Sequence, residues 1–211
     1  MSAAREEMLG RVRQAVEDAE PPPDTCADPA YRTTLDMGGA ELLDLFAGRV
    51  ADYRATVTRV SGDGVADALA AACHEHEVAR LGVPAGLPDR LRPAGVELVE
   101  DARLSATQLD RLDGALTGAA VGIAETGTIV LDGGPTSGRR ALTLVPDLHL
   151  CVIEADQVVG LLPEAIERLQ PAVRKGQPLT FVSGPSATSD IELIRVEGVH
   201  GPRTLHVILV G

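Results

Sequence analysis

Hydrophobic positions along the chain switch between helical and extended spacing, which predicts an α/β protein. In some segments apolar side chains recur as on amphipathic helices, and in others they fill short runs rich in Val, Ile and Leu. The expected helices are residues 3–19, 41–53, 65–76, 105–112 and 163–169, and the expected strands are residues 56–60, 78–83, 96–99, 119–124, 128–131, 148–153, 179–182 and 205–210. This alternation favours a mostly parallel sheet flanked by helices on both faces.

A proline-rich segment separates the first expected helix from the rest of the chain. Residues 20–29 contain four prolines and almost no apolar side chain, which is typical of a linker. We therefore expect residues 1–35 to form an N-terminal helix and linker, and residues 36–211 to form one α/β domain. A length of 211 residues suits one such domain with a small appendage.

Composition and charge exclude several classes of function. The net charge of −12 opposes binding to nucleic acid or anionic lipid, and an aromatic content of 2% is too low for a base-stacking platform. No apolar run approaches the ~20 residues of a membrane span. Acidic residues interrupt the N-terminal segment, whereas a signal peptide would have a continuous apolar run there. We therefore expect a cytoplasmic protein with neither a membrane span nor a nucleic-acid partner.

The cysteines predict that this chain binds no iron–sulfur cluster. Cys26, Cys73 and Cys151 are dispersed, form no C-x-x-C motif and cannot supply the four thiolates that a cluster needs. Their odd number and wide spacing also fit a reducing compartment. His149 and Cys151 share one face of an expected strand, where a buried structural pair is favoured over a pair of metal ligands.

The sequence His-Glu-His-Glu at residues 74–77 resembles a metal-binding cluster but predicts none. His74 and His76 stand two positions apart on an expected helix, so their side chains do not face the same ion. The alternative is the polar last turn of a helix, where histidine also complements the helix dipole. We therefore expect no metal site in this chain.

A carboxylate and hydroxyl groups interrupt an apolar run at residues 122–131, which marks a first candidate site. Glu125 stands there beside Thr126 and Gly127. A buried carboxylate at this position would be suited to proton transfer, and Gly127 would let a ligand approach the backbone. The alternative is a hairpin in which Glu125 points into solvent and Gly127 serves the turn. The residues alone favour neither interpretation.

A loop rich in glycine and hydroxyl groups follows a later apolar strand and marks a second candidate site. It contains Ser183, Gly184, Ser186, Asp190 and Glu192, and we expect it to open a helix. The free N–H groups of such a helix start attract phosphate or carboxylate, and Asp190 could bind a sugar or another hydroxyl group. In the alternative interpretation, Glu192 stands three positions after a serine, as in a capping box, and serves the helix alone.

A histidine in a Gly-Pro turn before the last expected strand is the third candidate. His200 could donate a proton or contact an anion near neutral pH, or it could bond a backbone carbonyl as an ordinary turn residue. In open α/β sheets, ligands collect at the carboxyl ends of the strands. We therefore expect one shared pocket, with Glu125 and His200 as the proton-handling pair, lined by Glu125, Ser183, Ser186, Asp190 and His200.

Four short blocks occur in an order that resembles the lactate-utilisation C family, whose defining unit is the LUD domain. They are Ala-Glu-Thr-Gly-Thr at 124–128, Leu-Val-Pro-Asp-Leu-His at 144–149, Ser-Gly-Pro-Ser-x-x-x-Asp-Ile-Glu at 183–192 and Gly-Val-His-Gly-Pro at 198–202. The resemblance is strongest over residues 115–211 and looser over residues 40–114. It implies a NagB/RpiA/CoA-transferase-like α/β fold, which agrees with the alternation of expected elements.

The resemblance also implies a function in the oxidation of L-lactate to pyruvate, as one subunit beside iron–sulfur partner proteins. This chain would bind no cofactor itself, because the clusters would lie on those partners. The blocks carry over only candidate site residues, with Glu125 and His200 as catalytic candidates and Thr126, Gly127, Ser183, Gly184, Ser186, Asp190 and Glu192 as ligand-binding candidates. The alternative is a free-standing enzyme or sensor that binds a small phosphorylated, CoA-linked or folate-type ligand.

Overall fold

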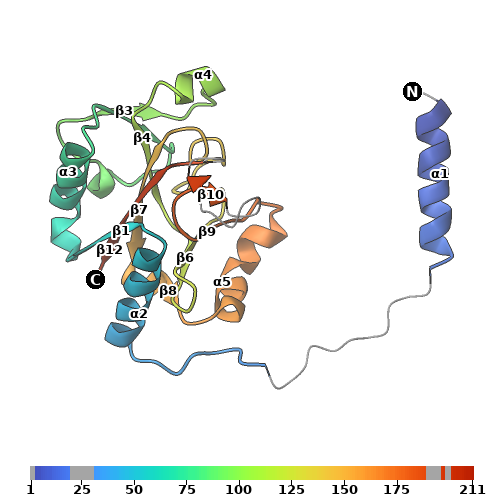
Figure 1. Ribbon diagram of the computed structural model, residues 1–211, viewed down its shortest axis with the longest axis horizontal. Coiled ribbons are helices and arrows are strands. Elements are labelled where there is room, and N and C mark those ends of the chain that lie inside the picture. Colours follow the sequence, from blue (N-terminus) through green and yellow to red (C-terminus); the bar gives the residue numbers. More distant parts are fainter. Residues whose placement is uncertain (1–2, 20–30, 189–195, 198–200) are drawn as a thin grey trace. The chain divides into compact units, whose positions relative to one another are not determined.

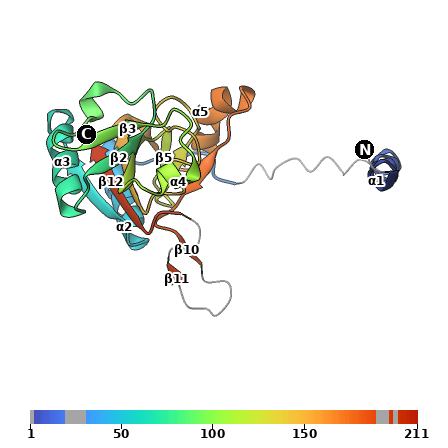
Figure 2. The same ribbon diagram turned by 90° about the horizontal axis from the view of Figure 1, so that it is seen from above.

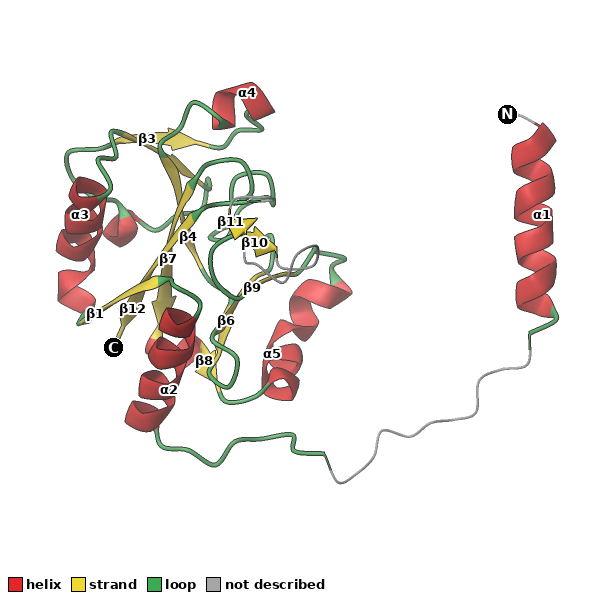
Figure 3. Cartoon of the chain, in the orientation of Figure 1, coloured by secondary structure: helices red, strands yellow, loops and turns green. Residues whose placement is uncertain are grey.

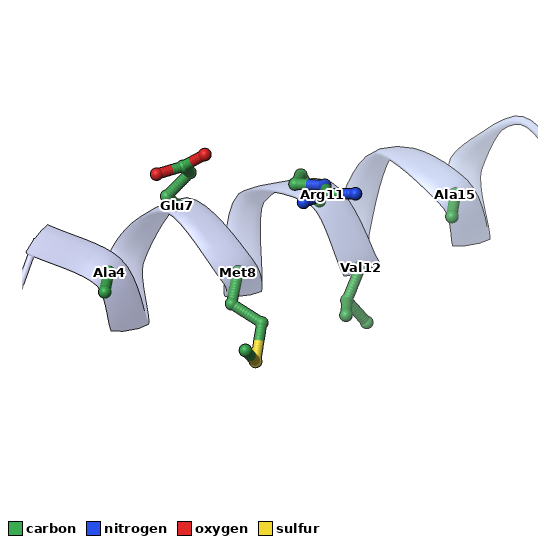
Figure 4. Close-up of a pocket in the computed structure, with 6 residues that line it drawn as sticks. All are labelled: Ala4, Glu7, Met8, Arg11, Val12 and Ala15. Atoms are coloured by element: carbon green, nitrogen blue, oxygen red, sulfur yellow. The ribbon is translucent and has the colours of Figure 1, made fainter.

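The computed structural model describes residues 3–19, 31–188, 196–197 and 201–211. The chain divides into two units, residues 1–32 and residues 33–211. In the first unit the described helix is α1 (Ala3–Glu17), which is exposed along its length. In Figure 4 the side chains of Met8 and Val12 point to the same side of α1, so the helix presents one apolar stripe.

The second unit is built on a six-stranded sheet in which all strands run parallel (Figures 1 and 3). The strand order is β1 (Thr56–Val60), β12 (Thr204–Val210), β7 (Leu148–Glu154), β4 (Gly114–Gly118), β2 (Arg80–Val83) and β3 (Glu97–Glu100). The predicted fold class, a mostly parallel sheet flanked by helices, is confirmed.

Alternate residues of the central strand β12 face two separate cores. Ile208 belongs to a core shared with α3 (Val65–Glu75), whereas Val207 belongs to a core shared with Phe46 of α2 (Gly39–Asp52). Both residues are fully buried, as expected for a strand covered on both faces. The helices α3 and α2 therefore cover opposite faces of the six-stranded sheet.

A smaller, four-stranded sheet adds a further layer on the α2 side. Its order is β8 (Val158–Val159), β5 (Val121–Ile123), β6 (Thr128–Leu131) and β9 (Thr180–Val182). Ile129 and Leu131 of β6 join the core that contains Phe46, while Val130 faces the other way and packs with Leu169 of α5 (Leu162–Arg174). The layers are thus α3, the parallel sheet, α2 with the small sheet, and α5.

Short elements complete the second unit. They are α4 (Ala106–Leu109), the single 3-10 turns Gly62–Gly64, Asp89–Leu91 and Ala155–Gln157, and the antiparallel pair β10 (Ala187–Thr188) and β11 (Val196–Glu197). Figure 2 shows β10 and β11 projecting away from the two sheets. None of the helices in the described part of the chain is long and apolar enough to cross a membrane.

The structure corrects several predicted elements. The sequence predicted no strand at residues 114–118, yet β4 is a buried central strand. Its glycines explain both the weak signal and the fit, because a Cβ on Gly114 would approach the Leu148 side chain at 3.1 Å. The expected strand 119–124 is shorter, and the expected helix 163–169 continues through Pro171 to Arg174. The loop at residues 183–192 was expected to open a helix, with a capping box at Ser189 and Glu192, and residues 189–195 lie outside the described residues.

Candidate functional site

The turn between β5 and β6 is held tightly against neighbouring elements. The backbone N–H of Glu125 donates to the Gly160 carbonyl at 3.1 Å. Gly127 has a φ of +60°, and a Cβ at this position would lie 2.5 Å from the backbone carbon of Arg49 in α2. Only glycine therefore fits the turn in this position.

Three hydroxyl groups form a chain at the end of the small sheet, which we call the hydroxyl cluster: Thr126, Thr128 and Ser183. The hydroxyl oxygens of Thr126 and Thr128 are 2.7 Å apart, and those of Thr128 and Ser183 are also 2.7 Å apart. The antiparallel pairing of β6 with β9 produces this contact, because it aligns Ile129 with Val182 and so sets Thr128 opposite Ser183. Thr128 is buried, whereas Thr126 and Ser183 are exposed and can bond a ligand oxygen.

The loop after β9 also packs closely against the rest of the unit. Gly184 has a φ of +111°, and a Cβ there would lie 2.5 Å from the Tyr53 Cβ. The backbone N–H of Ser186 donates to the Pro202 carbonyl at 2.8 Å, just before β12 begins. The loop from Ser183 to Ser186 therefore lies beside the end of α2 and the segment that leads into β12.

The structure brings several predicted site residues together, but it shows Glu125 exposed, whereas a proton-transfer role was argued from its burial. Thr126, Gly127, Ser183 and Gly184 lie around the hydroxyl cluster, and Glu125 adjoins it. The Glu125 side chain is exposed, so the interpretation as a buried, desolvated carboxylate is wrong. The reason is local, since Glu125 lies in the tight turn between the antiparallel strands β5 and β6, where its backbone N–H bonds Gly160.

The predicted pocket is tested only in part. Asp190, Glu192 and His200 lie outside the described residues, so the convergence of Glu125 with His200 remains a prediction. The expectation that this region lies at the carboxyl ends of the main strands is wrong, because residues 201–203 enter the amino end of β12. The carboxyl ends of β5 and β9 do point toward it, as the antiparallel small sheet allows.

A pocket that the sequence analysis did not anticipate lies at the carboxyl ends of β2 and β3. It has a volume of about 440 Å³ and combines the segments that follow β2, β3 and β6. It is lined by Pro84, Ala85, Gly86, Asp101, Gly133, Gly134, Pro135, Gly138, Arg139 and Gln177. The missed signal was the run Asp-Gly-Gly-Pro-Thr-Ser-Gly-Arg at 132–139, a glycine- and hydroxyl-rich loop directly after a strand.

An ion pair neutralises the charges of this pocket. The Arg139 guanidinium donates to both carboxylate oxygens of Asp101 at 2.6 and 2.7 Å, and also to the Leu104 carbonyl. The Asp101 side chain is 2% exposed, whereas that of Arg139 is 39% exposed. The hydrogen bond to Asp101 raises the pKa of Arg139. The pair therefore shapes the pocket wall and leaves little net charge for a ligand.

A second pocket of about 310 Å³ shares Gln177 with the first and is richer in positive charge. Arg168 and Lys175 of α5 and its C-terminal end line it, together with the amide side chain of Gln157. Arg168 donates to the Asp156 carbonyl, which fixes the guanidinium at the pocket. The two basic side chains Arg168 and Lys175 outnumber the one acidic side chain in this lining, that of Asp132, so the lining suits a small organic anion.

A row of polar side chains lies buried between β4 and β7. The His149 Nε2 atom is 2.8 Å from the Thr117 hydroxyl, which also donates to the Cys151 sulfur at 3.9 Å. Burial lowers the pKa of His149 to about 4, with a further contribution from the nearby Arg140 charge. Burial raises the pKa of Cys151 to about 12. Both groups are uncharged near neutral pH, and the predicted burial of this pair is confirmed.

A third group of polar side chains joins α3 to β12. His76 follows α3, and its Nε2 atom lies 3.2 Å from Nδ1 of His206 in β12. Glu75 completes the group, in which one potential ligand atom per residue lies within 4.8 Å of the others. The spacing argument for His74 and His76 did not find it, because His206 is 130 positions away.

Comparisons with known proteins match nearly the whole chain to one group of related proteins. The LUD domain family model matches residues 35–210. Lactate utilization protein C of Deinococcus radiodurans is 46% identical over 209 residues, covering 99% of this chain and 96% of the relative. Lactate utilization protein C of Bacillus velezensis is 24% identical, covering 97% and 91%. The crystal structure of a DUF162 family protein from D. radiodurans matches with a TM-score of 0.72 and 42% identity, covering 83% of this chain and 99% of that chain.

Proposed function

The chain belongs to the LUD domain family, and we propose that it serves lactate utilisation as a subunit without iron–sulfur clusters, beside iron–sulfur proteins that carry the electrons. The observation that carries this proposal is the 46% identity to Lactate utilization protein C of D. radiodurans over 99% of this chain. The aligned residues include the segment before the LUD domain as well as the domain itself.

The chemistry of lactate oxidation supports the division of labour. Converting L-lactate to pyruvate removes two electrons and two protons, so an electron acceptor is required. The sequence supplies three cysteines, fewer than the four thiolates of a cluster, and Cys73 and Cys151 are both buried. The acceptor in this proposal therefore belongs to a partner protein.

The hydroxyl cluster and its surroundings are the proposed site for the organic acid or for a partner group. Thr126 and Ser183 present exposed hydroxyls within a turn and a loop that glycines fix in place, and Glu125 directly precedes Thr126 in that turn. In this proposal Glu125 and His200 handle protons, and Gly184, Ser186, Asp190 and Glu192 complete the ligand contacts. The second pocket, with Arg168 and Lys175, is the competing location because its positive charge favours a carboxylate.

A growth experiment tests the function and distinguishes the two locations. Deleting the gene should prevent growth on L-lactate while leaving growth on glucose unchanged, and the wild-type gene should restore it. A Ser183→Ala gene that fails to restore growth would support the hydroxyl cluster, whereas a Lys175→Gln gene that fails would support the second pocket. Normal growth of the deletion strain on L-lactate would overturn the proposed function.

A pull-down tests the proposed partners. Tagged protein from lactate-grown cells should retain proteins that contain iron and acid-labile sulfide, while glucose-grown cells provide the control. Tight binding of a phosphate ester, CoA or a folate by the purified chain, with no such partners, would instead support a free-standing enzyme or sensor.

A further inference from the structure

We propose that Glu75, His76 and His206 form a binding site for a divalent first-row transition metal such as Zn²⁺. The site lies outside the hydroxyl cluster and both pockets. It reverses the expectation of no metal site, which considered only the side chains that share one helix. The fold supplies the missing ligand from a distant strand.

The fold brings the three residues together in a simple way. Glu75 is the last residue of α3, and His76 is the C-cap residue that follows it. Along β12, Ile208 faces the core under α3, so His206, two residues earlier, points to the same side of the sheet. His206 is 2% exposed, His76 is half-buried and Glu75 is exposed. The group therefore has one buried ligand and one side open to solvent.

The distance between the two imidazole nitrogens fits a shared metal ion. His76 Nε2 and His206 Nδ1 are 3.2 Å apart, and the rings are nearly perpendicular, at 84°. Two imidazole nitrogens bound tetrahedrally to Zn²⁺ at about 2.0–2.1 Å would be separated by roughly 3.3–3.4 Å. A carboxylate oxygen of Glu75 and one ring nitrogen of each histidine lie within 4.8 Å of one another, so a small side-chain movement completes three ligands.

A neighbouring hydroxyl group orients the buried histidine for this purpose. The Thr58 hydroxyl lies 2.8 Å from His206 Nε2. With its proton on Nε2, His206 donates to Thr58 and directs the lone pair of Nδ1 toward His76. A hydrogen bond to the other ring nitrogen fixes the tautomer of a metal-binding histidine.

Metal binding would replace the hydrogen bond between the two imidazole rings with a bond from each ring to the metal ion, and the fold would not change. In the metal-free protein, when the His206 proton is on Nε2, the hydrogen bond between the rings is donated by His76 Nε2 and accepted by His206 Nδ1. On binding, that proton moves to His76 Nδ1, both rings stay neutral, and each gives a lone pair to the ion. Two imidazoles and a single carboxylate favour Zn²⁺, Co²⁺ or Ni²⁺ over Mg²⁺ and Ca²⁺, which prefer oxygen ligands. Solvent supplies the fourth position.

Titration of purified, chelator-treated full-length protein with Zn²⁺ tests the site. We expect one equivalent to bind to the wild-type protein and to raise its melting temperature. Bound Co²⁺ should show the visible absorption of a four-coordinate ion. His76→Ala should weaken Zn²⁺ binding and abolish the thermal shift, whereas His74→Ala, a change at the exposed neighbouring histidine, should leave both unchanged.

A second variant tests the role of Thr58 as a positioning residue. Thr58→Val keeps a β-branched side chain but removes the hydroxyl, and we expect it to weaken Zn²⁺ binding by about 10–100-fold. Ni²⁺ should compete with Zn²⁺ for the site, and Mg²⁺ should not. Equal Zn²⁺ affinity in the wild-type and His76→Ala proteins, or an absence of binding in the wild type, would overturn the proposal.

Discussion

Arg139 donates two hydrogen bonds to the nearly buried carboxylate of Asp101, and this contact ties the loop after β6 to the end of β3. Asp101 also accepts the backbone N–H of Leu104 at 3.0 Å. A single carboxylate thus organises one wall of the first pocket.

Replacing this carboxylate should lower stability. We expect Asp101→Asn to reduce the free energy of unfolding by about 1–3 kcal/mol, because charge-assisted bonds are lost while Arg139 can partly regain water. Urea denaturation monitored by circular dichroism provides the measurement. Asp89→Asn, which removes an exposed ion pair with Arg92, should have no measurable effect. Equal losses in the two variants would contradict this account of the pocket wall.

The buried His149 should make stability depend on pH. Its pKa falls from 6.5 to about 4 on folding, so the unfolded chain binds its proton more readily. The stabilisation is therefore complete above pH 6.5 and decreases as the pH falls toward 4. Between neutral pH and pH 5 the loss from this residue is about 2 kcal/mol. His149→Asn should flatten the pH dependence by this amount in urea unfolding at pH 5 and 7, and an unchanged slope would contradict the assignment.

The close approach of Gly127 to α2 should make this glycine essential to the hairpin. Gly127→Ala adds a Cβ that would lie 2.5 Å from a backbone atom and also strains a φ of +60°. Gly176 has a similar φ of +68° but open space around it, so Gly176→Ala measures the conformational strain alone. We expect Gly127→Ala to cost at least ~1 kcal/mol more than Gly176→Ala. Similar melting temperatures for both variants would show that the hairpin can move away.

The first unit should be dispensable for folding of the second. Residues 33–211 form their own compact unit, and the LUD domain match begins at residue 35. We expect removal of residues 1–32 to change the melting temperature by less than ~5 °C, measured by differential scanning calorimetry. A larger decrease would show that α1 contributes to the core.

The candidate proton-handling pair should affect function without affecting stability. Glu125→Gln and His200→Ala should each abolish growth on L-lactate while the melting temperature stays nearly unchanged. Glu167→Gln, on the exposed side of α5, serves as the matched control and should support normal growth. Loss of growth accompanied by unfolding would favour a structural role for these residues.

Hydrophobic spacing predicted most of the fold because buried parallel strands are apolar on both faces. The strand at residues 56–60 matches β1, and the last expected strand differs from β12 by one residue. β4 was missed because Gly114 and Gly118 reduce its apolar signal. Leu148, a neighbour from another strand that the local sequence does not reveal, crowds Gly114, where an added Cβ would lie 3.1 Å from it.

The candidate sites were less predictable because they depend on distant contacts. The sequence located Thr126 and Ser183, but not the pairing of β6 and β9 that joins their hydroxyls through Thr128. It identified His76 but could not place His206 beside it. The sequence also left the burial of Glu125 open, and the structure shows the exposed alternative, because this polar residue between two apolar strands belongs to a turn.

The central position of β12 has a consequence for how the protein folds during synthesis. β12 lies between β1 and β7, so β1 gains its hydrogen-bonding partner only after residues 61–203 have been made. Until then the nascent chain exposes an unpaired edge at β1 and another at β7, which are templates for aggregation. A chain that stalls before residue 204 therefore lacks the strand that joins β1 to the rest of the parallel sheet.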